Sequence, residues 1–194
     1  MSAAMTGGCS SSDAGNDTPT TALVDELAAH DGQPCPPRLP LGDDPGGHGF
    51  GVEDPADEKP NLNPGQVAWL CRYETVDLPP DENGANFTWE LIGQAVRVPN
   101  KDLPMINQAL TAITPAPTDQ ICTDDLGPRW MIVTADETDL TGVVIDDYGC
   151  RGVRLTDEPF ATPPGEASGN GMVPGVLQGP TELLDTIRRI MHYP

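Results

Sequence analysis

The sequence predicts an α+β fold: a small antiparallel sheet of four to five strands, two amphipathic helices, two disulfides and a disordered N-terminal tether. Three observations predict it. Short runs of β-branched and aromatic residues are bounded by turn residues, as in strands. Two other segments repeat apolar residues every three or four positions, as in helices. Setting Cys9 aside leaves an even number of cysteines, which a disulfide framework requires.

The composition indicates one domain with long loops. The chain has 194 residues, of which 21 are Gly and 22 are Pro, and a single domain commonly takes about 100–150 residues. We expect residues 1–30 to hold the remnant of a truncated leader and a flexible tether. Residues 31–194 then form one disulfide-bonded domain, with Pro/Gly-rich loops at 36–65 and 161–180.

The first residues indicate that the protein is located outside the cell. The run Thr6-Gly7-Gly8-Cys9 resembles a lipobox, in which small residues precede a lipidated cysteine, although an aliphatic residue is usual where Thr6 stands. The polar run Ser10–Thr21 suits a flexible tether. We therefore expect lipidation at Cys9 and a place on the outer face of the cell membrane, or secretion. The alternative is a cytosolic protein with a disordered front and an unrelated cysteine.

Four segments have the composition of strands, and a fifth is weaker. The first two are 67–73, which alternates, and 87–92. Residues 129–135 and 140–147 are rich in β-branched residues and are separated by a polar tetrapeptide, so they form a candidate hairpin. Residues 150–155 are the candidate for a fifth strand. These segments account for the predicted four to five strands.

Two helices complete the predicted fold. Asn100 can cap the first helix, and Pro104 is tolerated in its first turn because first-turn N–H groups lack intrahelical partners. The second runs from Thr181 to Tyr193, after a stretch at 161–179 that is too rich in Gly and Pro to pack regularly. The expected inward residues are Leu103, Ile106, Leu110 and Ile113 in the first helix and Leu183, Leu184, Ile187, Ile190 and Met191 in the second.

The four remaining cysteines allow three pairings, and hairpin symmetry favours one. Cys122 and Cys150 have their midpoint at Asp136, inside the predicted turn, so they are expected to lie side by side within bonding distance. Cys35 then pairs with Cys71 by elimination and attaches the front loop to the first strand. The chain has no C-x-x-C, and its histidines lack metal-ligand spacing to any cysteine, which argues against a zinc site.

The charge balance excludes some partners. Thirty Asp and Glu stand against ten Lys and Arg, for a net charge of −20. Nucleic acid and anionic lipid surfaces bind through Lys and Arg, so neither is expected as a partner. The acidic residues are expected to keep the protein soluble and monomeric. The sequence has no apolar run long enough for a membrane helix, so membrane contact would be through a lipid anchor alone.

Carboxylates are the remaining candidates for chemistry. Serines occur only in the tail and the linker, which argues against a serine hydrolase, and metalloprotease and phosphate-loop motifs are lacking. The hairpin symmetry brings four carboxylates to its disulfide end, where they could hold Ca²⁺, the one cofactor considered: Asp124, Asp125, Asp146 and Asp147. The favoured alternative is that they cap turns and pair with Arg129, Arg151 and Arg154.

Two further groups have a functional and a structural interpretation. The loop Asp43–His48 could attract a metal, but a solvated turn is favoured. Trp69, Trp89 and Trp130 lie on predicted strands, where an exposed row could bind glycan or peptide. Packing in the core is the favoured interpretation for tryptophans so placed.

Three short motifs resemble those of a known family. They are Leu70-Cys71-Arg72-Tyr73, the run from Cys122 through Gly127-Pro128 into the hairpin, and Tyr148-Gly149-Cys150-Arg151. They resemble the "LCRY", "C-x3-4-GP" and "YGCR" segments of secreted or lipid-anchored actinobacterial proteins of unknown function. The resemblance runs from about Cys35 to the last helix. It implies export and the same cysteine pairing, and it brings no activity or functional residue.

These observations favour an exported, lipid-anchored envelope protein with a non-enzymatic domain that binds another protein, a peptide or a cell-wall component. The alternatives are an exported hydrolase that uses carboxylates such as Asp124 and Asp147, with or without Ca²⁺, and a structural spacer. A concave pocket with two converging carboxylates would favour the hydrolase.

Overall fold

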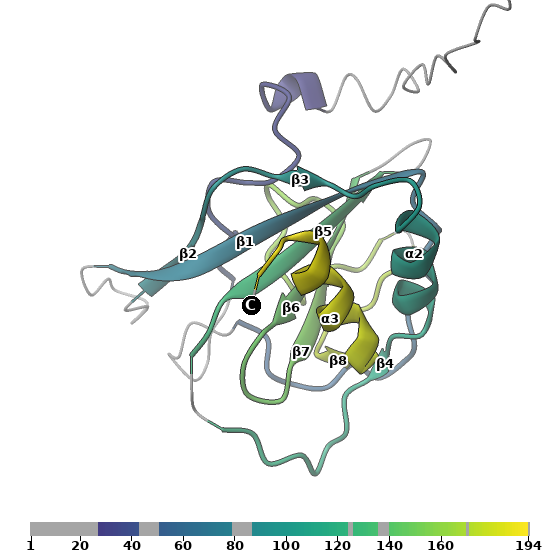
Figure 1. Ribbon diagram of the computed structural model, residues 1–194. Coiled ribbons are helices and arrows are strands. Elements are labelled where there is room, and N and C mark those ends of the chain that lie inside the picture. The colour runs from purple at the N-terminus through teal and green to yellow at the C-terminus, as the bar shows by residue number, and fades with distance from the viewer. Residues whose placement is uncertain are drawn as a thin grey trace, which may run out of the picture.

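The fold is α+β, built on one mostly antiparallel sheet (Figure 1). The computed structural model describes residues 27–42, 51–78, 87–123, 126–135, 140–169 and 171–193. The strands are β1 (Val67–Asp77), β2 (Phe87–Leu91), β3 (Val96–Arg97), β4 (Thr114–Pro115), β5 (Arg129–Ala135), β6 (Leu140–Asp146), β7 (Gly152–Thr156) and β8 (Leu177–Gln178). Their order is β2-β1-β5-β6-β7-β8-β4, and β3 pairs with β1 beside β2.

The sheet is larger than predicted, with eight strands instead of four to five. The three additional strands, β3, β4 and β8, have two residues each. Alternation of apolar and polar residues needs about four positions to be recognised. The five longer strands, in contrast, all fall on the predicted segments.

The central hairpin is buried on both sides. Every residue of β5 is buried, and so is every residue of β6 except Thr141. Strands covered on both faces consist of near-continuous apolar runs and show little alternation. This explains why both segments are dense in β-branched residues. The hairpin is therefore the centre of the fold.

Two apolar clusters cover the two faces of the sheet. On one face, α2 (Leu103–Thr111) and α3 (Thr181–Ile190) pack against residues such as Trp130 and Ile132. On the other face, Cys35 and Leu39 of the N-terminal segment pack against Trp89. The backbone N–H of Leu39 donates to the carbonyl of Trp89 at 3.0 Å, which covers the outer edge of β2. Segments from both ends of the domain thus close the core.

The two helices lie where the sequence predicts them, but their ends differ. Asp102, not Asn100, occupies the N-cap of α2, and its side chain makes no capping hydrogen bond. Ile113 is fully buried although it follows the end of α2. The helix α3 ends at Ile190, and Tyr193 lies beyond it, after a turn at residues 191–192. The buried residues of α3 are Leu183, Leu184, Thr186, Ile187 and Ile190.

The Gly/Pro-rich stretch 161–179 packs more regularly than predicted, and the loop 36–65 packs against it. The stretch 161–179 contains β8, and its Ala167, Met172 and Val173 belong to the main core cluster. Pro55, in the loop 36–65, forms an isolated bridge with Val176. Isolated apolar residues therefore anchor the described parts of both loops to the domain core, although the loop sequences have no hydrophobic periodicity.

The two disulfides join the pairs that the sequence predicts. Cys35–Cys71 has a Cα–Cα distance of 6.3 Å and both residues are buried. Cys122–Cys150 has a Cα–Cα distance of 5.0 Å, and Cys122 is exposed. The second bridge attaches the segment before β5 to the turn between β6 and β7.

The register of the hairpin differs from the prediction. Symmetry about Asp136 would place Leu126 opposite Asp146, but the observed partner is Arg129. The bridge still forms because Cys122 lies before β5 begins, where the chain has left the ladder. The turn 136–139 lies outside the described residues.

The predicted tether is described only at its end, where residues 27–29 are helical. Cys9 and the polar run Ser10–Thr21 lie outside the described residues. Among the residues that are described, every helix is too short or too polar to span a bilayer.

Candidate functional site

Two adjacent aspartates, Asp146 as the last residue of β6 and Asp147 directly after it, point to opposite faces of the sheet, as successive strand residues do. Asp146 faces Arg129 and Arg154, whereas Asp147 faces Trp130 and Arg188. Both carboxylates are almost completely buried, with side chains 6% and 2% exposed. The two therefore belong to different sites.

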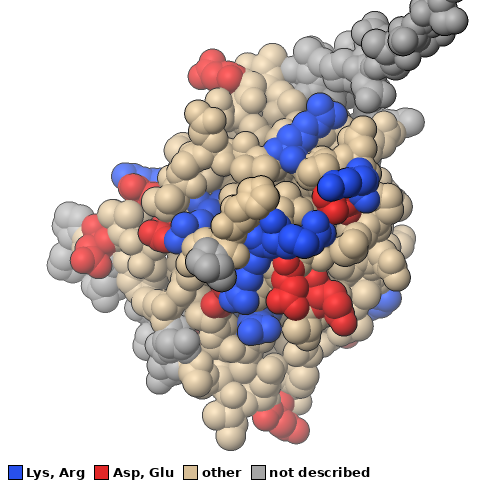
Figure 2. All heavy atoms as spheres, in the orientation of Figure 1, with Lys and Arg blue, Asp and Glu red and all other residues tan. Residues whose placement is uncertain are grey.

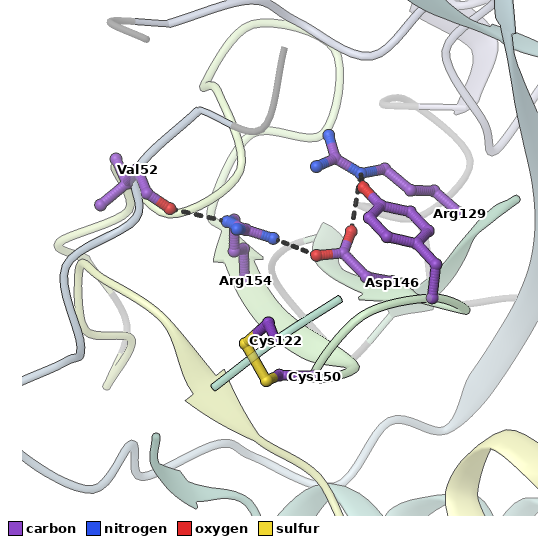
Figure 3. Close-up of polar contacts among 7 residues, drawn as sticks. Val52, Cys122, Arg129, Asp146, Cys150 and Arg154 are labelled. Atoms are coloured by element: carbon purple, nitrogen blue, oxygen red, sulfur yellow. Dashed lines mark hydrogen bonds and ion pairs between the residues drawn. A yellow bond between two sulfur atoms is a disulfide. The ribbon is translucent and has the colours of Figure 1, made fainter. Parts of the chain in front are cut away.

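Asp146 is held between two arginines (Figure 3). Nε of Arg129 donates to its Oδ1 at 2.7 Å, and Nη1 of Arg154 donates to its Oδ2 at 2.6 Å. Burial alone would raise the pKa of Asp146, but the two guanidinium groups more than offset this and lower the pKa. Asp146 is therefore ionised at neutral pH.

Aromatic rings fix the first of these arginines. The guanidinium of Arg129 lies 4.3 Å from the ring centre of Trp89, and Trp89 stacks on Tyr148 with ring centres 5.8 Å apart. Nε of Arg129 also donates to the hydroxyl of Tyr148 at 3.0 Å. Burial raises the pKa of Tyr148, so its phenol remains neutral. Arg129 thus serves as a rigid support for Asp146.

A pocket of about 360 Å³ opens beside this cluster. Asp146 and Arg154 contribute to its wall, as do the exposed Glu53 and the disulfide. The full lining is Glu53, Cys122, Thr123, Asp146, Tyr148, Gly149, Cys150, Gly152, Arg154 and Val176. Four separate chain segments meet here, and one disulfide fixes two of them. This is the strongest candidate site among the described residues.

Two glycines shape the pocket wall. Gly149 has φ of +51°, and a Cβ there would lie 3.2 Å from the carbonyl oxygen of Thr123. A Cβ on Gly152 would lie 3.2 Å from both Asp146 Oδ2 and Val176 Cγ1. Any larger residue at Gly152 would therefore press on the ion pair.

Asp147, on the other face, belongs to a closed structural cluster. Its carboxylate accepts from Trp130 Nε1 at 2.9 Å, from Arg188 Nε at 3.0 Å and from Arg188 Nη2. Trp130 packs edge-on against Tyr193, with ring centres 5.3 Å apart. The cluster attaches α3 and the residues after it to the hairpin.

The face that carries α3 has basic side chains at its centre, although the chain as a whole is strongly acidic. Figure 2 shows Lys and Arg side chains gathered there beside a group of acidic side chains. Arg188 and Arg189 lie in the last turn of α3 and form ion pairs with Asp147 and Asp102, respectively. Arg72 likewise pairs with Glu74. These paired arginines support the fold more directly than they offer a binding surface.

The structure places Asp146 and Asp147, two of the four residues of the predicted carboxylate cluster, in different environments. Asp146 and Asp147 do not converge, and Asp124 and Asp125 lie outside the described residues, as does the loop Asp43–His48. No group of three or more His, Cys, Asp or Glu side chains suited to a metal occurs within the described ranges. The favoured alternative holds in part, because Asp146 pairs with Arg129 and Arg154.

Sequence reasoning missed Glu53 as a wall of the pocket and Arg188 as the partner of Asp147. Arg154 offered a usable signal, since it is the one charged residue of β7 and lies between Val153 and Leu155. Of the tryptophans, Trp89 and Trp130 are buried in the core as expected, and Trp69 is half-buried.

No protein-family model matches the chain, and no curated protein or solved structure matches it at a significant level. The resemblance based on the "LCRY" and "YGCR" segments stays a prediction.

Proposed function

We propose that this chain is an exported envelope protein, anchored by a lipid on Cys9, whose domain binds a peptide, another protein or a cell-wall component without converting it. The observation that carries the proposal is the pocket of about 360 Å³, whose wall includes a disulfide and two members, Asp146 and Arg154, of a buried Arg–Asp–Arg cluster. Small-ligand pockets measure about 300–1,000 Å³ and have a few fixed polar groups in a mainly apolar wall.

Two lines of reasoning support export. Disulfides persist in oxidising compartments and are rare in the reducing cytosol of most organisms. The domain has two of them, and one is exposed. The lipobox-like run at Cys9 supplies the means of attachment.

Ionisation of Asp146 argues against its use as a general acid. A carboxyl that acts as general acid needs a raised pKa, whereas the two arginines lower the pKa of Asp146. A hydrolase remains the second candidate because Glu53 and Asp146 line the same pocket, which brings two carboxylates to one concave site.

Binding is tested by NMR. The ¹⁵N-labelled domain is titrated with soluble fragments of bacterial cell wall and with envelope peptides. We expect saturable amide shifts at Gly149, Cys150 and Gly152, and none at exposed Asp185 on α3. Shifts spread evenly over the surface, or none at all, would contradict a binding role for the pocket. Mass spectrometry of the same fragments separates the two candidates, since a hydrolase would shorten them.

Anchoring is tested separately in a bacterial host. The chain is expressed behind a lipoprotein leader, and the membrane fraction is analysed by intact mass. We expect a diacylglyceryl adduct on Cys9 and its loss in Cys9→Ser. A Cys9→Ser variant that remains membrane-bound would refute lipid anchoring at this residue.

A further inference from the structure

Arg154 is a buried cation in the wall of the pocket, and its bonding capacity is only partly used. Its side chain is 6% exposed. Nε donates to the carbonyl oxygen of Val52 at 2.8 Å and Nη1 donates to Asp146 at 2.6 Å (Figure 3). Nη2 has no hydrogen-bond partner among the described residues. A guanidinium has five N–H donors in a rigid fork, so donors remain for a ligand.

The charge of Arg154 is also only partly neutralised. Asp146, its one ion-pair partner in the described part of the chain, is shared with Arg129. Arginine binds carboxylates through two parallel hydrogen bonds, and such charge-assisted bonds are the strong ones. A ligand carboxylate would supply both the missing acceptor and the missing negative charge.

Glu53 adds a second requirement to the same pocket. It is exposed, lines the pocket and forms no ion pair with a described residue. Its negative charge disfavours a doubly charged anion such as phosphate and favours an ammonium group. A ligand with one carboxylate and one amino group satisfies both Arg154 and Glu53.

The size and the apolar wall narrow the ligand class. About 360 Å³ lies near the lower limit for small-ligand pockets, so it suits a ligand the size of a dipeptide better than a long chain. Val176, the Tyr148 ring and the disulfide offer apolar surface for a small side chain.

We propose that the pocket binds a free peptide about the size of a dipeptide, with its C-terminal carboxylate against Arg154 and its N-terminal amino group near Glu53. This rests on the proposed binding function and names its ligand class. Short peptides released from proteins and from the peptide stems of the cell wall share this chemistry. The two sources differ in configuration, because wall stems contain D-amino acids.

The test is an NMR titration with dialanine, its C-terminal amide and its N-acetyl derivative, in L,L and D,D forms. We expect dialanine to shift the amides of Gly149 and Gly152. The amide, which lacks the carboxylate, is expected to bind about tenfold more weakly or worse. Preference for the L,L or the D,D form then indicates the source.

Variants assign the two contacts. Glu53→Gln, an exposed change, is expected to weaken dialanine several-fold and leave the N-acetyl derivative unchanged, whereas Glu58→Gln, exposed and outside the pocket, changes neither. Arg154→Lys keeps the charge but loses the fork, and is expected to erase the difference between dialanine and its amide. Because Arg154 is buried, the fold of the Arg154→Lys variant is checked by circular dichroism. Glu53→Gln changes an exposed residue and tests the proposal independently.

Three results would overturn the inference. Equal binding of dialanine and its amide would remove the role of the carboxylate. An unchanged affinity in Glu53→Gln would remove the role of the amino group. Pocket shifts with cell-wall fragments but none with dialanine would leave the proposed function standing and refute the ligand class, whereas no shifts with either would refute both.

Discussion

Asp146 and Asp147 are neighbours in sequence, but the sheet between them gives them different environments. Each is buried and paired with arginine. Asp146 has two arginines that are themselves buried, and it borders a pocket. Asp147 has one ion-pair partner, Arg188, that is 31% exposed, and it lies under α3. Two buried ion pairs of the same kind therefore have different roles. One borders a pocket on one face of the sheet, and the other attaches a helix to the opposite face.

The largest expected loss of stability is that of Asp146→Asn. It leaves Arg129 and Arg154 buried without their shared carboxylate, and breaking a buried ion pair costs about 3–5 kcal/mol. Chemical denaturation should show this loss in the free energy of unfolding. Asp185→Asn, an exposed change on α3, is the control and should be nearly neutral. A loss below about 1 kcal/mol would mean that the cluster behaves like a surface ion pair.

Removal of a disulfide comes next, at about 2–4 kcal/mol for either pair. The double variants Cys122→Ser/Cys150→Ser and Cys35→Ser/Cys71→Ser should lose similar stability, because their sequence separations of 28 and 36 differ little. They should differ in function, since only Cys122–Cys150 lines the pocket. We expect the first variant to weaken binding in the NMR titration and the second to preserve it while folded. Equal loss of binding would show that the pocket depends on global stability alone.

Accessibility offers a second measurement on the same pairs. With mild reductant under native conditions, alkylation should modify Cys122 and Cys150 before the buried Cys35 and Cys71. Peptide mapping by mass spectrometry follows the order. Simultaneous modification would indicate global unfolding as the route to both.

Asp147→Asn should lower the free energy of unfolding less than Asp146→Asn or the removal of a disulfide does. Asparagine can still accept from Trp130, and Arg188 can turn to water because it is partly exposed. A hydrogen bond to a charged group contributes about 1.5–3 kcal/mol, so we expect a loss in that range, below that of Asp146→Asn. The reverse order, measured by the same denaturation, would place the structural centre on the α3 face.

The difference between these faces was accessible from the sequence, but the pocket was not. Asp146 and Asp147 are consecutive on a predicted strand, so alternation alone separates them, whereas the expected calcium cluster required them to converge. The hairpin strands were predictable because burial on both faces demands β-branched residues throughout. The register was not, because the residues 136–139 between the strands do not dictate how the ladder is aligned.

The pocket requires information that is spread along the chain. Glu53, Thr123 and Val176 meet at it although no local pattern links them. Val176 directly precedes β8, which is too short to be recognised, and Glu53 lies in the Pro/Gly-rich loop 36–65, which has no hydrophobic periodicity. The cysteine pair was predictable in spite of the wrong register, since a bridge beyond the ladder tolerates an offset that ladder pairs do not.

The smallest expected effect is a dependence on acid pH. It concerns the difference in free energy of unfolding between the native protein and Asp146→Asn. The pKa of Asp146 is lowered in the folded state, so its contribution is complete above the unfolded value of about 3.9 and is lost as the pH falls through the folded value. One carboxyl changes the free energy of unfolding by at most about 1.4 kcal/mol per pH unit. We therefore expect the stability gap between the two proteins to narrow below about pH 4 and to remain constant from pH 5 to 7. Since all other carboxyls titrate in both proteins, their contributions cancel in the gap. A gap that widens toward acid would mean that Asp146 is protonated in the folded protein.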